Sequence, residues 1–136
     1  MRSRQRQHLF IASLIMLSSL APSLPAQAYD GLDLYDCVIS DQDRFNSKGV
    51  RLTSVRNILA QDRANYHKFN RRDTLDSADQ TFLTPGQRQL WQSARVDIDP
   101  ALRAKILNGG AVAITVYVFS RDWIEVREGL IPPGVS

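Results

Sequence analysis

The stretch AVAITVYVFSRDWIEVR, residues 111–127, decides the fold. Residues 111–119 are rich in β-branched and aromatic side chains, which favour strands because they pack well on a pleated sheet. Residues 120–122 are polar and form a turn, and Ile124 and Val126 then alternate with polar neighbours. Two β-forming runs joined by a short polar turn predict a β-hairpin over residues 111–127.

Two further segments of the chain are predicted to be strands. Residues 32–40 are rich in strand-forming side chains, and they lead into the polar run 40–49, which has the composition of a loop. In residues 94–99, Val96 and Ile98 alternate with polar residues, as in a half-exposed strand. The order of the strands in a sheet does not follow from these local patterns.

Three helices are predicted between the strands, each with a capping residue at its start. The first begins after residues 53–54, where a short hydroxyl side chain can cap it, and ends near Asn70. The second opens at residues 84–87 (TPGQ), in which threonine is the cap, proline the first helical residue and glutamine the capping-box partner. The third opens at residues 99–100 (DP) and stops at residues 108–110 (NGG).

Apolar residues at the helical period predict which side of each helix is buried. The expected anchors are Val55, Ile58, Leu59, Tyr66 and Phe69 in the first helix, Leu83, Leu90 and Trp91 around the second, and Leu102, Ile106 and Leu107 in the third. Strands before, between and after helices predict a small single α+β domain. We expect a mostly antiparallel sheet, including the C-terminal hairpin, packed with two or three helices.

Residues 1–28 are predicted to be a cleavable signal peptide. Three arginines and no acid precede the apolar run 9–20, and residues 26–28 (AQA) offer small side chains at the positions that a signal peptidase reads. The apolar run has 12 residues, whereas a membrane-spanning helix needs about 20. We therefore expect a mature chain of residues 29–136, with a short tail over 129–136, that is periplasmic or secreted and has no transmembrane segment.

The charge of the chain is balanced once the predicted signal peptide is set aside. The whole sequence has 17 basic and 14 acidic residues. Three of the basic residues and none of the acidic ones precede Tyr29, so 14 of each remain. A neutral chain lacks the basic surface that binds a phosphate backbone, and we therefore expect no nucleic-acid partner.

Cys37 is the only cysteine in the sequence, so it cannot form a disulfide within the chain. It shares a strand face with Tyr35 and Ile39, which predicts a buried and unreactive thiol. The alternatives are a nucleophilic thiol and a disulfide that links two chains. The sequence does not determine the oligomeric state.

Asp62 lies four residues after Ile58 and four before Tyr66, at the centre of the apolar side of the first helix. A buried carboxylate needs a partner, because burying a lone charge is costly. We predict that Asp62 and Tyr66 form a buried polar anchor, in which Asp62 accepts hydrogen bonds from an arginine or from a loop backbone. The functional alternative is an acid or base with a shifted pKa in a cleft.

The polar, arginine-rich segment 56–73 is the predicted binding surface. Arginine offers a fork of donors that matches carboxylate and phosphate groups. We expect a non-catalytic binding domain whose partner is another envelope or extracellular protein, or a small anionic ligand. The alternative for this segment is the solvated side of an amphipathic helix. The residues assigned to the binding surface are Arg56, Arg63, His67, Asn70, Arg71 and Arg72.

Two other functions are compatible with the sequence. The first is a hydrolase-type enzyme that uses Asp62 and His67 as acid and base. These residues lie five apart, about 140° from each other around a helix, which makes it difficult for them to share one substrate. The second is a structural subunit of an envelope assembly, joined through an exposed sheet edge or through Cys37.

We expect neither a cofactor nor a metal site. One histidine, His67, and one cysteine remain in the predicted mature chain, fewer than the three or four ligands of a zinc site. Aspartates cluster at residues 41–43, 73–79 and 97–99, which leaves calcium as an alternative, although residues 41–46 depart from the EF-hand pattern. The sequence contains no phosphate-binding loop, dinucleotide fingerprint or H-E-x-x-H motif.

Overall fold

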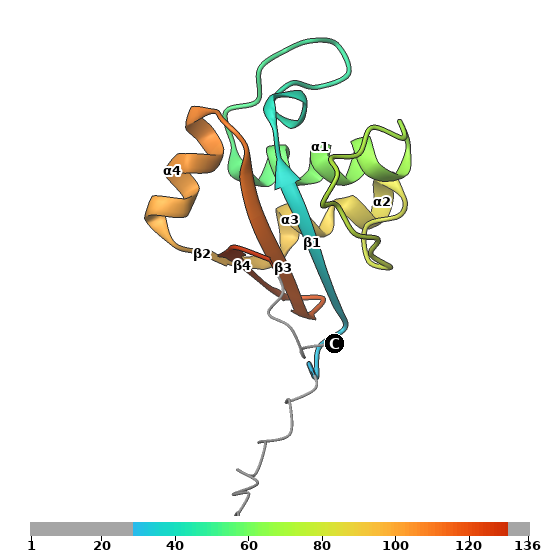
Figure 1. Cartoon of the computed structure of the whole chain (residues 1–136). Coiled ribbons are helices and arrows are strands. Elements are labelled where there is room, and N and C mark those ends of the chain that lie inside the picture. The colour runs from blue at the N-terminus through green and yellow to red at the C-terminus, as the bar shows by residue number, and fades with distance from the viewer. Residues whose placement is uncertain (1–28, 131–136) are drawn as a thin grey trace, which may run out of the picture.

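The computed structural model describes residues 29–130. The predicted signal peptide and residues 131–136 of the predicted tail lie outside the described residues. Strands and helices alternate along the described part of the chain (Figure 1). In order, they are β1 (Asp33–Ile39), the short 3-10 helix η1 (Asp41–Arg44), α1 (Val55–His67), α2 (Pro85–Arg88), α3 (Leu90–Ser93), β2 (Arg95–Ile98), α4 (Pro100–Asn108), β3 (Val112–Ser120) and β4 (Trp123–Glu128).

The strands form one four-stranded sheet in the order β1-β3-β4-β2. β3 is antiparallel to β1 and to β4, with Val116 opposite Tyr35 on one side and opposite Val126 on the other. β2 runs parallel to β4 at the far edge. Because β1 and β2 therefore run in the same direction at opposite edges, the chain crosses the sheet between them through α1, α2 and α3. The prediction of a small α+β domain with a mostly antiparallel sheet is confirmed.

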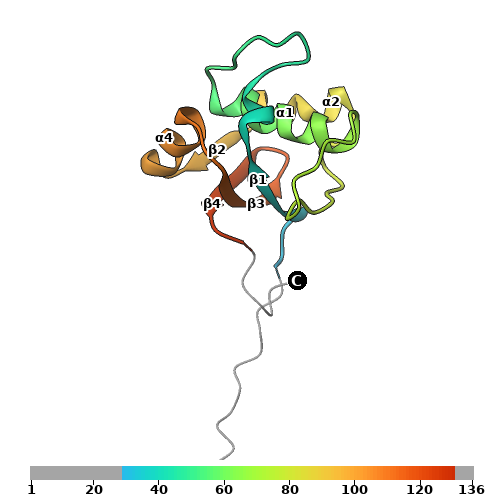
Figure 2. The same ribbon diagram turned by 45° about the horizontal axis from the view of Figure 1, so that its top comes forward.

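All the described helices lie on one face of the sheet (Figure 2). Successive side chains of a strand point to opposite faces, so Ile114, Val116 and Val118 of β3 face the helices, whereas Tyr117 and Phe119 lie on the other face. No described helix covers that second face. Between the two layers lies one core, whose largest members are Tyr35, Ile39, Ile58, Leu59, Phe82, Trp91, Ile106, Ile114 and Ile124. The predicted burial of Cys37 is confirmed.

Two of the three predicted caps form hydrogen bonds as expected. Thr84 Oγ1 accepts from the Gln87 backbone N–H at 3.2 Å, and Gln87 Oε1 accepts from the Thr84 N–H at 2.9 Å. Asp99 Oδ1 accepts from the Ala101 N–H at 2.8 Å at the start of α4. Ser54 is the N-cap of α1 but makes no side-chain capping bond, so the expected role of its hydroxyl is wrong.

Two predicted core anchors are wrong, because each lies just outside its helix. Phe69 is 36% exposed, since α1 ends at His67 and the chain then turns through the positive φ of Asn70. Leu83 is 43% exposed, because its neighbour Phe82 enters the core and stacks on Trp91 with ring centroids 4.9 Å apart. Helical periodicity does not apply beyond a helix end, and it therefore misplaced both residues.

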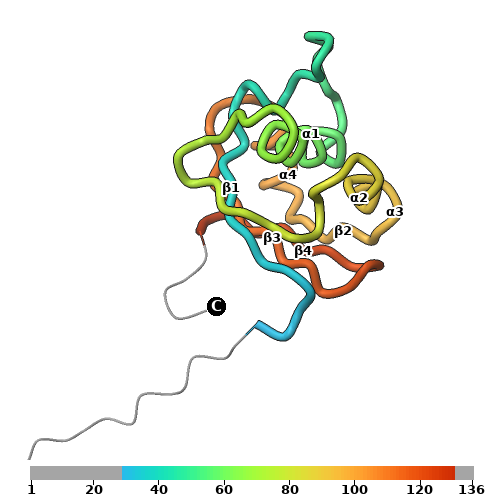
Figure 3. The backbone as a smooth tube through the Cα atoms, turned by 90° about the vertical axis from the view of Figure 1, so that its right-hand side faces the viewer, coloured from blue at the N-terminus to red at the C-terminus, as the bar shows by residue number. Residues whose placement is uncertain are grey.

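The loop between α1 and α2 covers the outer edge of β1, as Figure 3 shows for the segment after α1. Asp76 Oδ1 accepts from the Val38 N–H and Ser77 Oγ accepts from the Asp36 N–H, both at 2.8 Å. The backbone groups of this edge are thus paired with loop side chains, which protects the edge from pairing with another chain. No helix among residues 29–130 is long and apolar enough to cross a membrane.

Candidate functional site

The polar residues of α1 divide into a buried set and an exposed set. Asp62 is 1% exposed and Tyr66 is also buried, so both lie where the apolar pattern of the helix predicts. Arg63 is 0% exposed, although the predicted binding surface placed it on the outer side of the helix. The periodicity failed to predict its burial because a long arginine side chain can reach a partner well away from its own position on the helix.

Arg63 is the centre of a buried polar network. Its Nε donates to Asp62 Oδ2 at 2.7 Å, and its Nη1 donates to Asp79 Oδ1 at 3.1 Å and to the Ser77 carbonyl at 3.0 Å. The guanidinium also lies over the ring of Tyr35, 4.3 Å from the ring centroid. One cation thus joins α1, β1 and the loop before α2.

His67 belongs to the same network through Asp79. Its Nε2 lies 2.6 Å from Asp79 Oδ1, while Asp79 Oδ2 accepts from the Phe82 backbone N–H at 2.6 Å. The sequence analysis placed Asp79 in an aspartate cluster but did not predict its contacts with Arg63 and His67. Its position three residues before Phe82 is typical of an aspartate that caps a turn. Asp62 and His67, the proposed acid and base, bond to different partners, and Arg63 and Asp79 lie between them.

Burial shifts the pKa values of the groups in and beside this network. Desolvation raises the pKa of Asp62 from 3.8 to about 7, although the Arg63 guanidinium acts in the opposite direction. Desolvation is the largest influence on the pKa of Arg63 and acts to lower it, but the charge and hydrogen bond of Asp62 together with the other nearby groups outweigh desolvation, and the net shift is upward. Burial, followed by the nearby Asp62, raises the pKa of the Cys37 thiol well above its ordinary value. A protonated, enclosed thiol of this kind is a poor nucleophile.

The buried network therefore links three parts of the fold. Its ion pairs join α1 to the loop before α2, and the contact of Arg63 with the Tyr35 ring adds β1. This arrangement agrees with the predicted polar anchor, in which Asp62 accepts a hydrogen bond from an arginine. The contacts that carry Arg63 inward also remove its guanidinium from the surface where a ligand could reach it.

Two more of the predicted binding arginines donate to backbone carbonyls. Arg56 Nη1 donates to the carbonyls of Trp91 and Ala94, the latter at 2.8 Å, and so ties α1 to the end of α3. Arg72 lies over the Tyr66 ring at 4.1 Å and its Nε is 3.4 Å from the Tyr66 carbonyl. Both guanidinium groups thus contact other parts of the protein itself, which is a structural role.

Arg71 is the predicted binding residue that opens onto a groove. The groove, called the α1 groove below, has a volume of about 380 Å³ and lies between the second half of α1 and the loop before it. Its lining residues are Gln42, Phe45, Asn46, Ser47, Gly49, Gln61, Asn65, Phe69 and Arg71. The sequence analysis did not predict Phe45 and Asn46 as site residues, because their segment has the composition of an ordinary loop. They line the groove only because the tertiary structure brings this loop beside α1.

The floor of the α1 groove is a fixed chain of polar groups. Asn65 Nδ2 donates to Asp43 Oδ1 at 2.8 Å, and Gln61 Nε2 donates to Asn65 Oδ1 at 2.9 Å. The loop wall is also fixed, since Asn46 Oδ1 accepts from the Val50 N–H at 2.9 Å. The groove is thus preformed: its amide groups are held in place before any ligand arrives.

Comparisons with known proteins provide no relative from which a function can be transferred. No protein-family model, no curated protein and no solved structure matches this chain. Within residues 29–130, no three histidine, cysteine or acidic side chains lie close enough together to hold a metal ion. The function of the chain must therefore be inferred from its own surface.

Proposed function

We propose that this protein is an exported, non-catalytic binding domain that holds a small anionic ligand in the α1 groove. The observation that carries the proposal is the Arg71 guanidinium beside a preformed floor of amide groups. Arg71 has no acidic partner among the described residues, whereas Arg63, Arg95 and Arg127 each pair with a carboxylate. An unpaired arginine at the rim of a groove can offer its full set of donors to an anion.

The walls of the groove favour a ligand with an apolar or aromatic part. Phe45 and Phe69 are both exposed large hydrophobic residues, and both line the groove. Cations lie near each ring: Arg51 is 5.8 Å from the Phe45 ring centroid, and Lys68 is 5.1 Å from that of Phe69. An aromatic carboxylate or phosphate ester would place its ring between the phenylalanines and its charge near Arg71.

A titration with small aromatic probes tests this proposal. The purified protein is titrated with benzoate, phenyl phosphate and neutral benzyl alcohol while its backbone amide signals are followed by NMR. We expect the anions to shift the signals of Asn46, Gly49 and Asn65, and Arg71→Gln to weaken anion binding about tenfold or more, because a charge-assisted hydrogen bond is lost. Benzyl alcohol should bind the variant and the wild type equally.

Arg103→Gln is the matched control, because Arg103 is an exposed arginine on α4 and does not line the α1 groove. This variant should bind the anions as the wild type does. Equal anion affinity in Arg71→Gln and Arg103→Gln would contradict the assignment of the site. Anion-induced shifts confined to some other surface would contradict it as well.

A further inference from the structure

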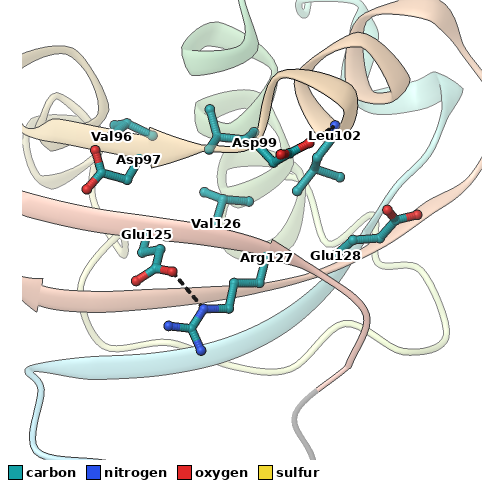
Figure 4. Close-up of a pocket in the computed structure, with 9 residues that line it drawn as sticks. Val96, Asp97, Asp99, Leu102, Glu125, Val126, Arg127 and Glu128 are labelled. Carbon is teal, nitrogen blue, oxygen red and sulfur yellow. Dashed lines mark hydrogen bonds and ion pairs between the residues drawn. The ribbon is translucent and has the colours of Figure 1, made fainter.

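A second groove lies at the β2 edge of the sheet, where β2 ends before β4 does. β2 stops at Ile98, because Asp99 and Pro100 turn the chain into α4, whereas β4 continues to Glu128. The gap forms a groove of about 590 Å³, called the edge groove below (Figure 4). Its lining residues are Val96, Asp97, Ile98, Asp99, Leu102, Glu125, Val126, Arg127 and Glu128.

The edge groove has apolar and polar parts in distinct places. Val126 points toward α4 and Leu102, whereas Glu125 and Arg127 point away from α4, onto the sheet face that the described helices leave open (Figure 4). Binding sites for small molecules commonly combine an apolar surface with a few polar groups that fix the orientation of the ligand. The edge groove has this composition.

The carboxylates of the edge groove are already paired within the protein. Asp97 Oδ2 lies 2.7 Å from Arg95 Nη2, Glu125 Oε1 lies 2.7 Å from Arg127 Nε, and Glu128 Oε1 lies 2.7 Å from Lys105 Nζ. Asp99 caps α4. Three of the four carboxylates thus have a basic partner, and the fourth accepts backbone N–H groups. They still have acceptor positions to spare, since a carboxylate can accept about four hydrogen bonds.

An exposed indole adjoins this polar rim. Trp123 is 39% exposed, and its Nε1 donates to Asp97 Oδ2 at 2.9 Å. Its ring stacks on Phe119 with centroids 4.3 Å apart, and Phe119 in turn stacks on Tyr117. The aromatic row fixes the indole beside the carboxylate of Asp97 on the open face of the sheet.

We infer that the edge groove, together with Trp123, binds a neutral saccharide. Sugar hydroxyls both donate and accept, so they can bond to the paired carboxylates of Asp97 and Glu125 and to the guanidinium of Arg127 at the same time. The apolar C–H face of a sugar ring can pack against the indole, which has one apolar and one polar part. A neutral ligand fits because Asp97, Glu125 and Glu128 already have basic partners and do not need a charged ligand to compensate them.

The experiment follows the indole N–H signal of Trp123 by NMR while the purified protein is titrated with maltotriose, cellotriose or chitotriose. At least one of these trisaccharides should shift that signal together with the amide signals of Glu125 and Arg127. The double variant Glu125→Gln/Arg127→Gln removes both charges of one ion pair, so it leaves neither charge unpaired. It should weaken saccharide binding about tenfold or more through lost charge-assisted hydrogen bonds.

The two grooves serve as controls for each other. Arg71→Gln should leave trisaccharide binding unchanged, and the Glu125→Gln/Arg127→Gln variant should leave benzoate binding unchanged. Failure of either proposal is therefore distinguishable from failure of the other. The saccharide assignment is overturned if no trisaccharide shifts the Trp123 signal, if the double variant binds as tightly as the wild type, or if the polyamine spermidine produces the shifts that the sugars do not.

Discussion

Two ion pairs in this protein have the same nitrogen–oxygen distance and different surroundings. Arg63 Nε lies 2.7 Å from Asp62 Oδ2, and Arg127 Nε lies 2.7 Å from Glu125 Oε1. The first pair is enclosed between α1, β1 and the loop before α2, whereas the side chain of Arg127 is more than half exposed on the open sheet face. Distance alone therefore does not tell a structural pair from one that a ligand can use.

Burial decides the role of each pair. Water screens the exposed pair, so its contribution to stability is small and its donors and acceptors stay accessible. In the buried pair, removing one partner leaves a charge without solvent or counter-ion, which is strongly destabilising. We therefore expect loss of one partner to destabilise the buried network strongly, whereas the exposed pair is accessible to a ligand.

The largest expected effect comes from Arg63→Met. This change leaves Asp62 and Asp79 buried without their shared cation, so we expect a loss of about 3–5 kcal/mol in the free energy of unfolding. Urea denaturation at pH 7, followed by tryptophan fluorescence, measures it. A loss no larger than that of a surface arginine substitution would show that the buried network does not hold the fold together.

The second-largest effect is a pH-dependent difference in stability between the wild type and Asp62→Asn. In the folded protein the pKa of Asp62 is raised from 3.8 to about 7, so the unfolded chain releases this proton first as the pH rises. The stability that neutral Asp62 contributes is thus complete below about pH 4 and is lost as the pH rises to about 7. Asparagine cannot ionise, and the stability advantage of the wild type over the variant should therefore shrink across this window.

This change with pH is expected to be on the order of 4 kcal/mol, because each unit of pKa corresponds to about 1.4 kcal/mol. Urea denaturation of both proteins at pH 4, 5.5 and 8 measures the difference directly. A difference that stays constant or grows with pH would contradict the upward direction of the Asp62 pKa.

The smallest effect is expected for Arg127→Met, the matched control for Arg63→Met. An exposed ion pair contributes about 0–1 kcal/mol, and the contact of Arg127 with the Tyr117 ring, 4.5 Å from its centroid, adds a similarly small amount. We therefore expect a loss of about 1 kcal/mol or less in the same urea experiment. A loss equal to that of Arg63→Met would remove the distinction between the two pairs.

Local patterns were sufficient to predict most of the secondary structure. Strand-forming composition and apolar alternation predicted the strands, and the caps at Thr84 and Asp99 predicted where two helices begin. These signals depend on neighbours close in the chain. The predictions for Phe69 and Leu83 were wrong because these residues lie beyond helix ends. The strand order β1-β3-β4-β2 depends on contacts between distant segments and was not predictable.

The candidate sites were less predictable than the fold. Segment 56–73 was the expected binding surface, and Arg71 at its end does line a groove. Phe45 also lines that groove and comes from a segment whose composition predicted an ordinary loop. The edge groove was not anticipated, because it depends on where β2 stops relative to β4, which no local pattern records.

Arg44 shows most simply what sequence and tertiary structure each decide. The sequence placed it in a polar run, and it does lie in a short 3-10 helix outside the sheet. Only the fold buries it completely, with Nε donating to the Ile106 carbonyl at 2.8 Å and Nη2 to the Gly110 carbonyl at 2.7 Å. Helix and strand formation depends on residues a few positions apart, so the sequence alone determined those elements. The burial of a charge depends on partners far along the chain, and only the tertiary structure brings them together.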